Sequence, residues 1–284
     1  MAIGLALKDP SAALVRRLAP AAEQSGYGVL LFPELSIVGQ QRYTGRDPFV
    51  SSAIALEATE RLRAGPGVVG TVFHTPRHLA MRGASLMEAS GGRFVLGVGA
   101  SHRGFAEEIG VAYPASPLGH VRDHLMALRA VGERLAFPGP APIWLAALGP
   151  RMAALGGELA DGLLLNWVSP EGVRETIAQV RAATGRRPTI AVYLRLDTPD
   201  RLQAQARTYF EMFPNYARHF SRQGLHSPQA VAAATAAPID DPGAIAERAA
   251  AYTTAGCDEV ILYPADVAEG DALRWLEATP APEL

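Results

Sequence analysis

A set of residues in this sequence comes directly after short apolar runs of strand length. Its members are Lys8, Glu34, His74, Ser101, His102, Gly149, Asn166, Trp167, Arg195 and Tyr263. Two of them suit proton transfer, because an imidazole titrates near neutrality and a carboxylate can be tuned toward it. We take His102 as the first candidate for a catalytic acid or base and Glu34 as the second.

Lys8 could form a Schiff base, since it follows the apolar run Ile3–Leu7. That chemistry needs a desolvated lysine with a lowered pKa. A lone lysine at a strand end is more often an ion-pair partner, here of Glu34. A lysine-dependent aldolase is therefore a poorer alternative.

Histidine pairs at helical spacing raise the question of a metal site. His120 and His124 lie four residues apart, but no acidic partner at ligand spacing accompanies them. We interpret them as an exposed polar helix face. His74 and His78 share the spacing, with the helix-starting Pro76 between them. We expect no metal site.

Two glycine-containing turns could meet a ligand through the backbone. Gly149 and a following proline open a helix, so the N–H groups of residues 147–149 and the helix dipole could bind a phosphate. Gly65, Pro66 and Gly67 stand at the entry to an apolar run. Such residues mark a bulge or a close backbone approach to a ligand, although a simple turn is the other interpretation.

The elements that position these residues are marked by a repeated pair, an oxygen-bearing residue followed by proline. The pairs are Asp9-Pro10, Asp47-Pro48, Thr75-Pro76, Ser116-Pro117, Ser169-Pro170, Thr198-Pro199, Ser227-Pro228 and Asp241-Pro242. Such pairs favour helix starts, because the side chain caps free N–H groups and proline at the first position loses no hydrogen bond. In the helix after Asp47, we expect Val50, Ile54, Ala58 and Leu62 to form one buried stripe.

Strand-length apolar runs alternate with these helix starts. We predict strands at Ile3–Leu7, Val29–Phe32, Val68–Val72, Phe94–Gly97, Ile143–Ala146, Gly162–Leu165, Thr189–Leu194 and Glu259–Leu262. Eight strands interleaved with helices favour a (β/α)₈ barrel over a doubly wound sheet, and no Gly-x-Gly-x-x-Gly turn follows the first strand. The stretch from Leu225 to Pro238 is the least regular and predicts an excursion or lid before the last βα unit. In such a barrel, functional residues lie at the strand C-termini.

Composition narrows the class of protein. The 284 residues carry a net charge of −2 and one cysteine, Cys257, which excludes intrachain disulfides and cysteine-based zinc sites. No basic run indicates nucleic acid or a membrane surface, and no stretch of eighteen apolar residues occurs. We expect one cytoplasmic barrel domain over residues 1–284.

Three blocks of sequence resemble the bacterial luciferase-like monooxygenase superfamily. They are the run from Asp47 to "VLGVGASH", then "PIWLAALGPRMAALGGELADGLLLNWVSPEG", and the closing "AYTTAGCDEVILYP". The resemblance implies a (β/α)₈ barrel, often dimeric, that binds FMN or the 5-deazaflavin coenzyme F420 at the strand C-termini. "AALGP" and "LLNW" look most like the F420-dependent branch of actinobacteria.

The resemblance also implies roles for loops. A non-prolyl cis peptide in the third-strand bulge would fall at Gly67–Val68 and back the cofactor ring. The loop of Ala146, Ala147, Leu148 and Gly149 would contact the cofactor phosphate through its backbone. Gly99, Ala100, Ser101 and His102 would border the ring.

Two departures decide between the branches. FMN-dependent luciferases place a phosphate-binding arginine where this chain has Ala100, which favours F420. Deazaflavin dehydrogenases resembling this chain carry an acid followed by a histidine after the second strand. Here Glu34 is kept, but Leu35 takes the histidine's place, and His102 stands where that subgroup has a glutamate.

The sequence therefore predicts hydride transfer between F420 and a small organic substrate, in a homodimer. Trp167, Tyr193, Arg195 and Tyr263 would line the substrate pocket. Tyr193 and Trp167 could equally be barrel packing, and Arg195 could hold an anionic substrate or the cofactor's tail or form a surface salt bridge. An FMN-dependent monooxygenase using O₂ is the first alternative. A catalytically silent cofactor-binding protein, suggested by Leu35, is the second. The loop from Ser36 to Arg46 and the stretch from Tyr216 to Pro238 would also line the substrate site.

Overall fold

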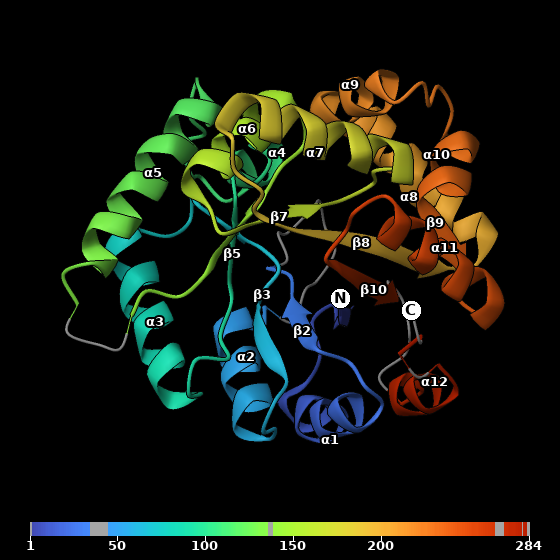
Figure 1. The fold of residues 1–284 in the computed structure, drawn as a ribbon, viewed down its shortest axis with the longest axis horizontal. Coiled ribbons are helices and arrows are strands. Elements are labelled where there is room, and N and C mark those ends of the chain that lie inside the picture. The colour runs from blue at the N-terminus through green and yellow to red at the C-terminus, as the bar shows by residue number, and fades with distance from the viewer. Residues whose placement is uncertain (1, 35–44, 136–138, 265–269, 280, 283–284) are drawn as a thin grey trace.

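A computed structural model describes residues 2–34, 45–135, 139–264, 270–279 and 281–282. Its centre is a barrel of parallel strands surrounded by helices (Figure 1). The strands are β1 (Ala2–Ala6), β2 (Val29–Phe32), β3 (Arg63–Pro66), β4 (Val69–Gly70), β5 (Leu96–Gly99), β6 (Ile143–Ala146), β7 (Gly162–Leu165), β8 (Thr189–Asp197), β9 (Ala236–Pro238) and β10 (Glu259–Pro264). The predicted barrel is confirmed.

The third barrel strand is split in two. β3 pairs with β2 and β4 pairs with β5, and the barrel closes where Ala64 bridges to Phe94. The predicted strand Val68–Val72 is therefore wrong as a single run, because its first half lies upstream, at Arg63–Pro66. Three predicted strands, at β2, β6 and β7, match their observed bounds, and the other four differ by one to three residues at an end.

The helices form an outer ring around these strands (Figure 1). They are α1 (Ala12–Gln24), α2 (Pro48–Glu57), α3 (Pro76–Ala89), α4 (Arg103–Glu108), α5 (Pro117–Gly132), α6 (Pro150–Leu159), α7 (Pro170–Thr184), α8 (Pro199–Met212), α9 (Pro214–Arg222), α10 (Pro228–Thr235), α11 (Pro242–Thr254) and α12 (Ala272–Ala278). Seven of the eight predicted residue–proline pairs start a helix as N-cap and first turn. The exception is Asp9-Pro10, since α1 begins later, with Ser11 as its N-cap.

Two expectations about buried faces are wrong. Val50 is exposed and α2 ends before Leu62, so the expected stripe does not exist; Phe49, Ser52 and Leu56 are buried instead. The pair on α5 is not an exposed polar face either, because His124 is only 5% exposed. Its Nε2 atom lies buried without a hydrogen-bond partner among the residues that the structure describes.

The buried side chains divide into an outer core and a lumen. Along β2, Leu30 and Phe32 join the large cluster packed under the helices, while Val29 and Leu31 join a smaller one. The smaller cluster takes inward-facing residues from around the barrel, including Tyr193 of β8 and Tyr263 of β10. This alternation is what a closed barrel requires of its strands.

The segment before the last βα unit forms the expected excursion. α8, α9 and α10 gather beside the barrel at the upper right of Figure 1. β9 then pairs with Arg195–Asp197 at the top of β8, beyond the point where β7 has ended. The excursion has a core of its own around Trp167, Tyr216 and Phe220. Among the described helices, none is long and apolar enough to cross a membrane.

Candidate active site

The carboxyl ends of the strands meet at one mouth, where three non-glycine residues adopt left-handed backbone conformations. They are Asp9 after β1, Ser101 after β5 and Trp167 after β7, with φ of 50°, 61° and 53°. Such conformations are uncommon outside glycine and gather at functional sites. The mouth is therefore the first place to look for a ligand site.

One side of the mouth is built from backbone and small side chains. The Gly67–Val68 peptide is cis, as expected from the resemblance. Gly99 lies against this segment so closely that a Cβ there would stand 3.1 Å from both Val68 Cγ2 and Ala146 Cβ. We refer to Gly67, Val68, Gly99 and Ala146 as the floor.

Hydrogen bonds hold the floor from two strands. The Gly67 N–H donates to Phe32 O over 2.9 Å, and the buried Tyr193 hydroxyl donates to Gly67 O. A Cβ on Gly67 would lie 2.5 Å from that hydroxyl, so this position requires glycine. Tyr193, expected to line the substrate pocket, thus also anchors the floor.

Glu34 contacts the floor at its other end. Its N–H donates to Val68 O over 3.2 Å, and its Oε2 accepts the Gly70 N–H over 2.7 Å. Its Oε1 lies 2.6 Å from His74 Nε2, and Arg82 approaches His74 Nδ1 to 3.4 Å. His74 was among the candidate residues at strand ends, but its contact with Glu34 was not predicted. Its position after the strand next to that of Glu34 was the signal for this contact. Leu35 lies outside the described residues.

His102 stands at the rim among aromatic rings. Its ring centroid is 4.4 Å from that of Phe213, 5.2 Å from Phe105 and 5.8 Å from Tyr216. Desolvation in this setting lowers the pKa of His102 to about 4. The side chain is therefore neutral near pH 7. Ala100 and Ser101, its neighbours, are partly buried at the end of β5.

The loop expected to bind phosphate runs from Ala146 to Gly149 and leads into α6. Gly149 has a φ of 156° and is the N-cap, as the helix-start argument requires. The Ala147 N–H, however, donates to Leu164 O over 3.4 Å, so one of the expected anion donors is used by β7. Arg222 of α9 covers the loop, donating to Leu148 O over 3.0 Å.

Arg195 is a buried cation at the top of β8. Its guanidinium donates to Asn166 Oδ1, Gln205 Oε1 and the Tyr209 hydroxyl over 3.1 to 3.2 Å. It also lies over the rings of Trp167, Tyr209 and Tyr263 at 4.8 to 5.2 Å. The expected surface salt bridge is not what the structure has, because Arg195 is buried and its hydrogen-bond partners are neutral.

The four expected substrate residues are brought together here. Trp167 and Tyr263 border Arg195, and the rings of Tyr263 and Tyr193 are 5.2 Å apart. All four side chains are more than nine-tenths buried, and Trp167 is fully so. Trp167 faces the excursion core on its other side, so it joins the mouth to that core.

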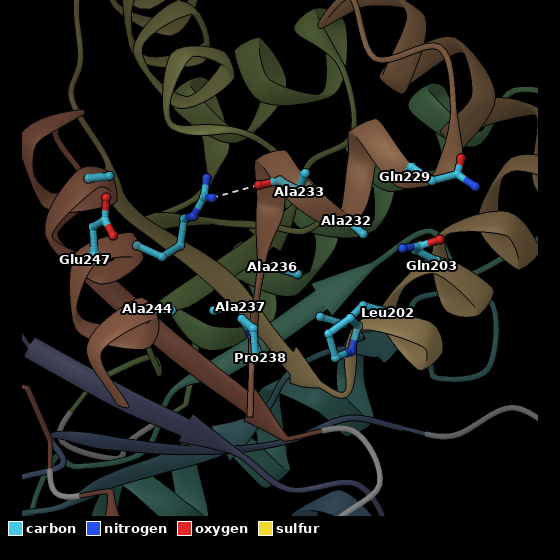
Figure 2. Close-up of a pocket in the computed structure, with 13 residues that line it drawn as sticks. Leu202, Gln203, Gln229, Ala232, Ala233, Ala236, Ala237, Pro238, Ala244 and Glu247 are labelled. Carbon is cyan, nitrogen blue, oxygen red and sulfur yellow. Dashed lines mark hydrogen bonds between the residues drawn. The ribbon is translucent and has the colours of Figure 1, made fainter. Parts of the chain in front are cut away.

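Other chemistries find less support. No group of three metal-ligating side chains occurs within the described ranges. Lys8 is exposed, which does not fit a desolvated Schiff-base lysine. A cavity of about 460 Å³ lies between α8, α10, β9 and α11, and none of the residues assigned to the mouth lines it (Figure 2). Its walls are largely alanine, and Arg248 beside it caps the α10 carbonyls at Ala233 and Ala234.

The sequence is similar to that of a relative named by its reaction, a methylenetetrahydromethanopterin reductase. Over 164 residues the chain is 31% identical to the 5,10-methylenetetrahydromethanopterin reductase of Archaeoglobus fulgidus, which covers 51% of this chain and 49% of the reductase. The match thus spans about half the length of that relative.

Solved structures of low sequence identity share the fold. An F420-dependent secondary alcohol dehydrogenase in complex with an F420–acetone adduct has a TM-score of 0.77 at 14% identity, over 98% of this chain and 97% of that one. The oxygenating constituent of 3,6-diketocamphane monooxygenase from the CAM plasmid of Pseudomonas putida, in complex with FMN, has a TM-score of 0.66 at 16% identity, over 100% and 99%. The family model described as luciferase-like monooxygenase matches residues 3–259. The chain belongs to the luciferase-like monooxygenase family.

Proposed function

We propose that this protein is an oxidoreductase that transfers a hydride between coenzyme F420 and a small organic substrate. The observation that carries the proposal is the floor, where Val68, Gly99 and Ala146 lie against one another and present backbone and small side chains. A flat heteroaromatic ring can rest against such a surface, whereas larger side chains there would occupy its place. When bound, the deazaflavin supplies or accepts the hydride.

The cofactor contacts follow from the floor. Gly67, Val68, Gly99, Ala100 and Ser101 would border the ring. Leu148 and Gly149, with Ala146 and Ala147 behind them, would face the phosphate at the start of α6, where the helix dipole favours an anion. Ala100 carries no charge, and Arg222 reaches the loop from α9, at Leu148 O. The phosphate arginine of the FMN branch therefore has no counterpart at that position.

The proton is assigned to His102. Because its pKa is lowered to about 4, the neutral imidazole is a proton acceptor in the resting protein. This state suits the direction in which the substrate loses a hydride and a proton together, as an alcohol does. Trp167, Tyr193, Arg195 and Tyr263 would form the substrate wall, with Arg195 favouring a substrate oxygen that carries negative charge.

Titration of the purified protein with F420 and with FMN tests the choice of cofactor. We expect micromolar binding of F420, followed by absorbance changes of the bound cofactor with one or more members of a panel of alcohols, enones and imines. Binding of FMN alone, with O₂ consumption by the reduced flavin, would establish the monooxygenase, which the FMN-bound structural neighbour makes the second candidate. Binding of F420 without turnover across the panel would favour the silent cofactor-binding protein.

The assembly is a further part of the proposal. We infer one barrel domain over residues 1–284 and a homodimer. Val50 of α2, Met81 of α3 and Met126 of α5 are 58%, 42% and 56% exposed on adjoining helices, which suits a subunit contact. Sedimentation at micromolar concentration tests this, and a mass of about 30 kDa rather than 60 kDa would contradict it.

A further inference from the structure

We propose that Glu34, held by His74, is a positioning residue that fixes the backbone of residues 68–70, where the chain leaves the floor, and does not exchange protons with the substrate. The inference rests on the proposed function only for the identity of the cofactor that binds on the floor. The hydrogen bonds of Glu34 and His74 are present in the protein without a cofactor.

Glu34 holds this segment at both ends. Its backbone N–H donates to Val68 O over 3.2 Å, and its side-chain Oε2 accepts the Gly70 N–H over 2.7 Å. Two bonds from one residue, across three residues of chain, fix the direction in which the Val68 and Val69 peptides face. Gly70 has further neighbours in the ring of Phe73 and in Ser101, so the segment borders the loop after β5 as well.

His74 fixes the carboxylate in turn. Arg82 Nη1, which can only donate, lies 3.4 Å from His74 Nδ1. His74 Nε2 is the donor to the carboxylate oxygen Glu34 Oε1, over 2.6 Å. Each carboxylate oxygen thus receives a donor from the protein, and the short bond to His74 is charge-assisted.

The network packs against the outer core on its His74 side, and the side chains of Glu34 and His74 are 20% and 17% exposed. His74 stands edge-on to Phe49 at 6.1 Å, and Phe49 stacks on Phe94 at 6.3 Å, both in the outer core under the helices. Glu34 and His74 therefore reach the mouth through the backbone of residues 68–70. A group that acts on a substrate proton must itself touch the substrate.

Variants of His74 test, in the cofactor-free protein, whether Glu34 and His74 hold the backbone of residues 68–70. We expect His74→Leu to speed hydrogen exchange of the Gly70 amide by about tenfold, the loss of one charge-assisted hydrogen bond. His74→Gln keeps a side-chain N–H donor and should restore most of the protection. His78→Leu is the matched control, because His78 is an exposed histidine four residues further along, in α3. Unchanged Gly70 exchange in both His74→Leu and Glu34→Gln would overturn the proposal.

Experiments on the cofactor-bound protein distinguish a positioning role of Glu34 from a role in proton transfer. We expect His74→Leu and Glu34→Gln to raise the F420 dissociation constant about tenfold, to shift the absorbance of the bound cofactor and to keep both limbs of the wild-type pH profile of kcat/KM. Loss of one limb in Glu34→Gln, with wild-type cofactor affinity, would make Glu34 a proton-transfer residue and overturn the proposal. If the wild type binds neither F420 nor FMN, the proposed function fails. Hydrogen exchange of the Gly70 amide then still tests whether Glu34 positions residues 68–70.

Discussion

Three histidines of this protein are held neutral by burial, and their surroundings separate their roles. Desolvation lowers the pKa of His102, His124 and His219 to about 4 in each case. His219 is bound inside the excursion, with Nε2 3.0 Å from Trp167 O, and His124 faces the core under α5. Of the three, only His102 is partly exposed, at the mouth after β5. We therefore expect His102, and not the other two, to exchange a proton with the substrate.

Replacement of His102 by Gln should lower kcat/KM by about 10²- to 10⁴-fold, the usual size of a general-base contribution. Cofactor affinity should change little, because the floor is backbone. His78→Gln, at an exposed histidine of α3 that belongs to no assigned site, is the control. A full rate in His102→Gln would remove His102 from the proposed mechanism.

Tyr193 tests the anchoring of the floor through a single oxygen. In Tyr193→Phe the ring stays, but Gly67 O loses its donor in a buried place. We expect the free energy of unfolding to fall by about 1–3 kcal/mol, the cost of an unpaired buried polar group. Urea denaturation measures this, and Tyr113→Phe, whose hydroxyl donates to Ser101 O in a half-buried setting, should cost less. Equal stability of Tyr193→Phe and the wild type would contradict the anchoring role.

At the scale of elements, the third strand controls the shape of the mouth. β3 and β4 are offset so that Gly65 crosses β5 where the barrel closes, and a Cβ on Gly65 would fall on the carbonyl oxygen of Val95. Only glycine allows this approach of two backbones. The floor exists because the strand is interrupted between these two halves.

Gly65→Ala should therefore destabilise the protein by about 3 kcal/mol or more, since backbone rather than a flexible side chain must move. Gly104→Ala is the matched control, because a Cβ on Gly104 meets nothing within 4 Å. It should change the stability by less than about 1 kcal/mol. Thermal unfolding compares the two, and a small effect of Gly65→Ala would mean that the barrel seam is loosely closed.

The elements also show what the sequence could predict. The helix starts were found because capping is local chemistry, readable from two adjacent residues. The stripe from Val50 to Leu62 failed because a strict spacing of four drifts by about 40° per step around a helix with 3.6 residues per turn. The buried face of His124 and the contact of Glu34 with His74 depend on neighbours from other elements, which no local pattern contains.

At the scale of the whole molecule, buried neutral histidines tie the stability of the barrel to pH. His124 and His219 are 5% and 8% exposed, on two different helices, α5 and α9. In the unfolded chain both titrate near 6.5. Between pH 6.5 and about 4 the unfolded state binds protons that the folded state does not, so the folded state loses stability as the pH falls.

The expected loss is about 3 kcal/mol for each histidine, the free energy that corresponds to a pKa moved from 6.5 to about 4. His124→Leu removes one of the two groups and a buried Nε2 that lacks a partner in the described part of the chain. Its stability, measured by urea denaturation from pH 7.5 to 4, should fall less steeply than that of the wild type, by about 3 kcal/mol over the range. His226→Leu, an exposed histidine, should follow the wild-type curve. Parallel curves for His124→Leu and the wild type would show that His124 titrates normally in the folded protein, and the barrel would then owe its acid sensitivity to other groups.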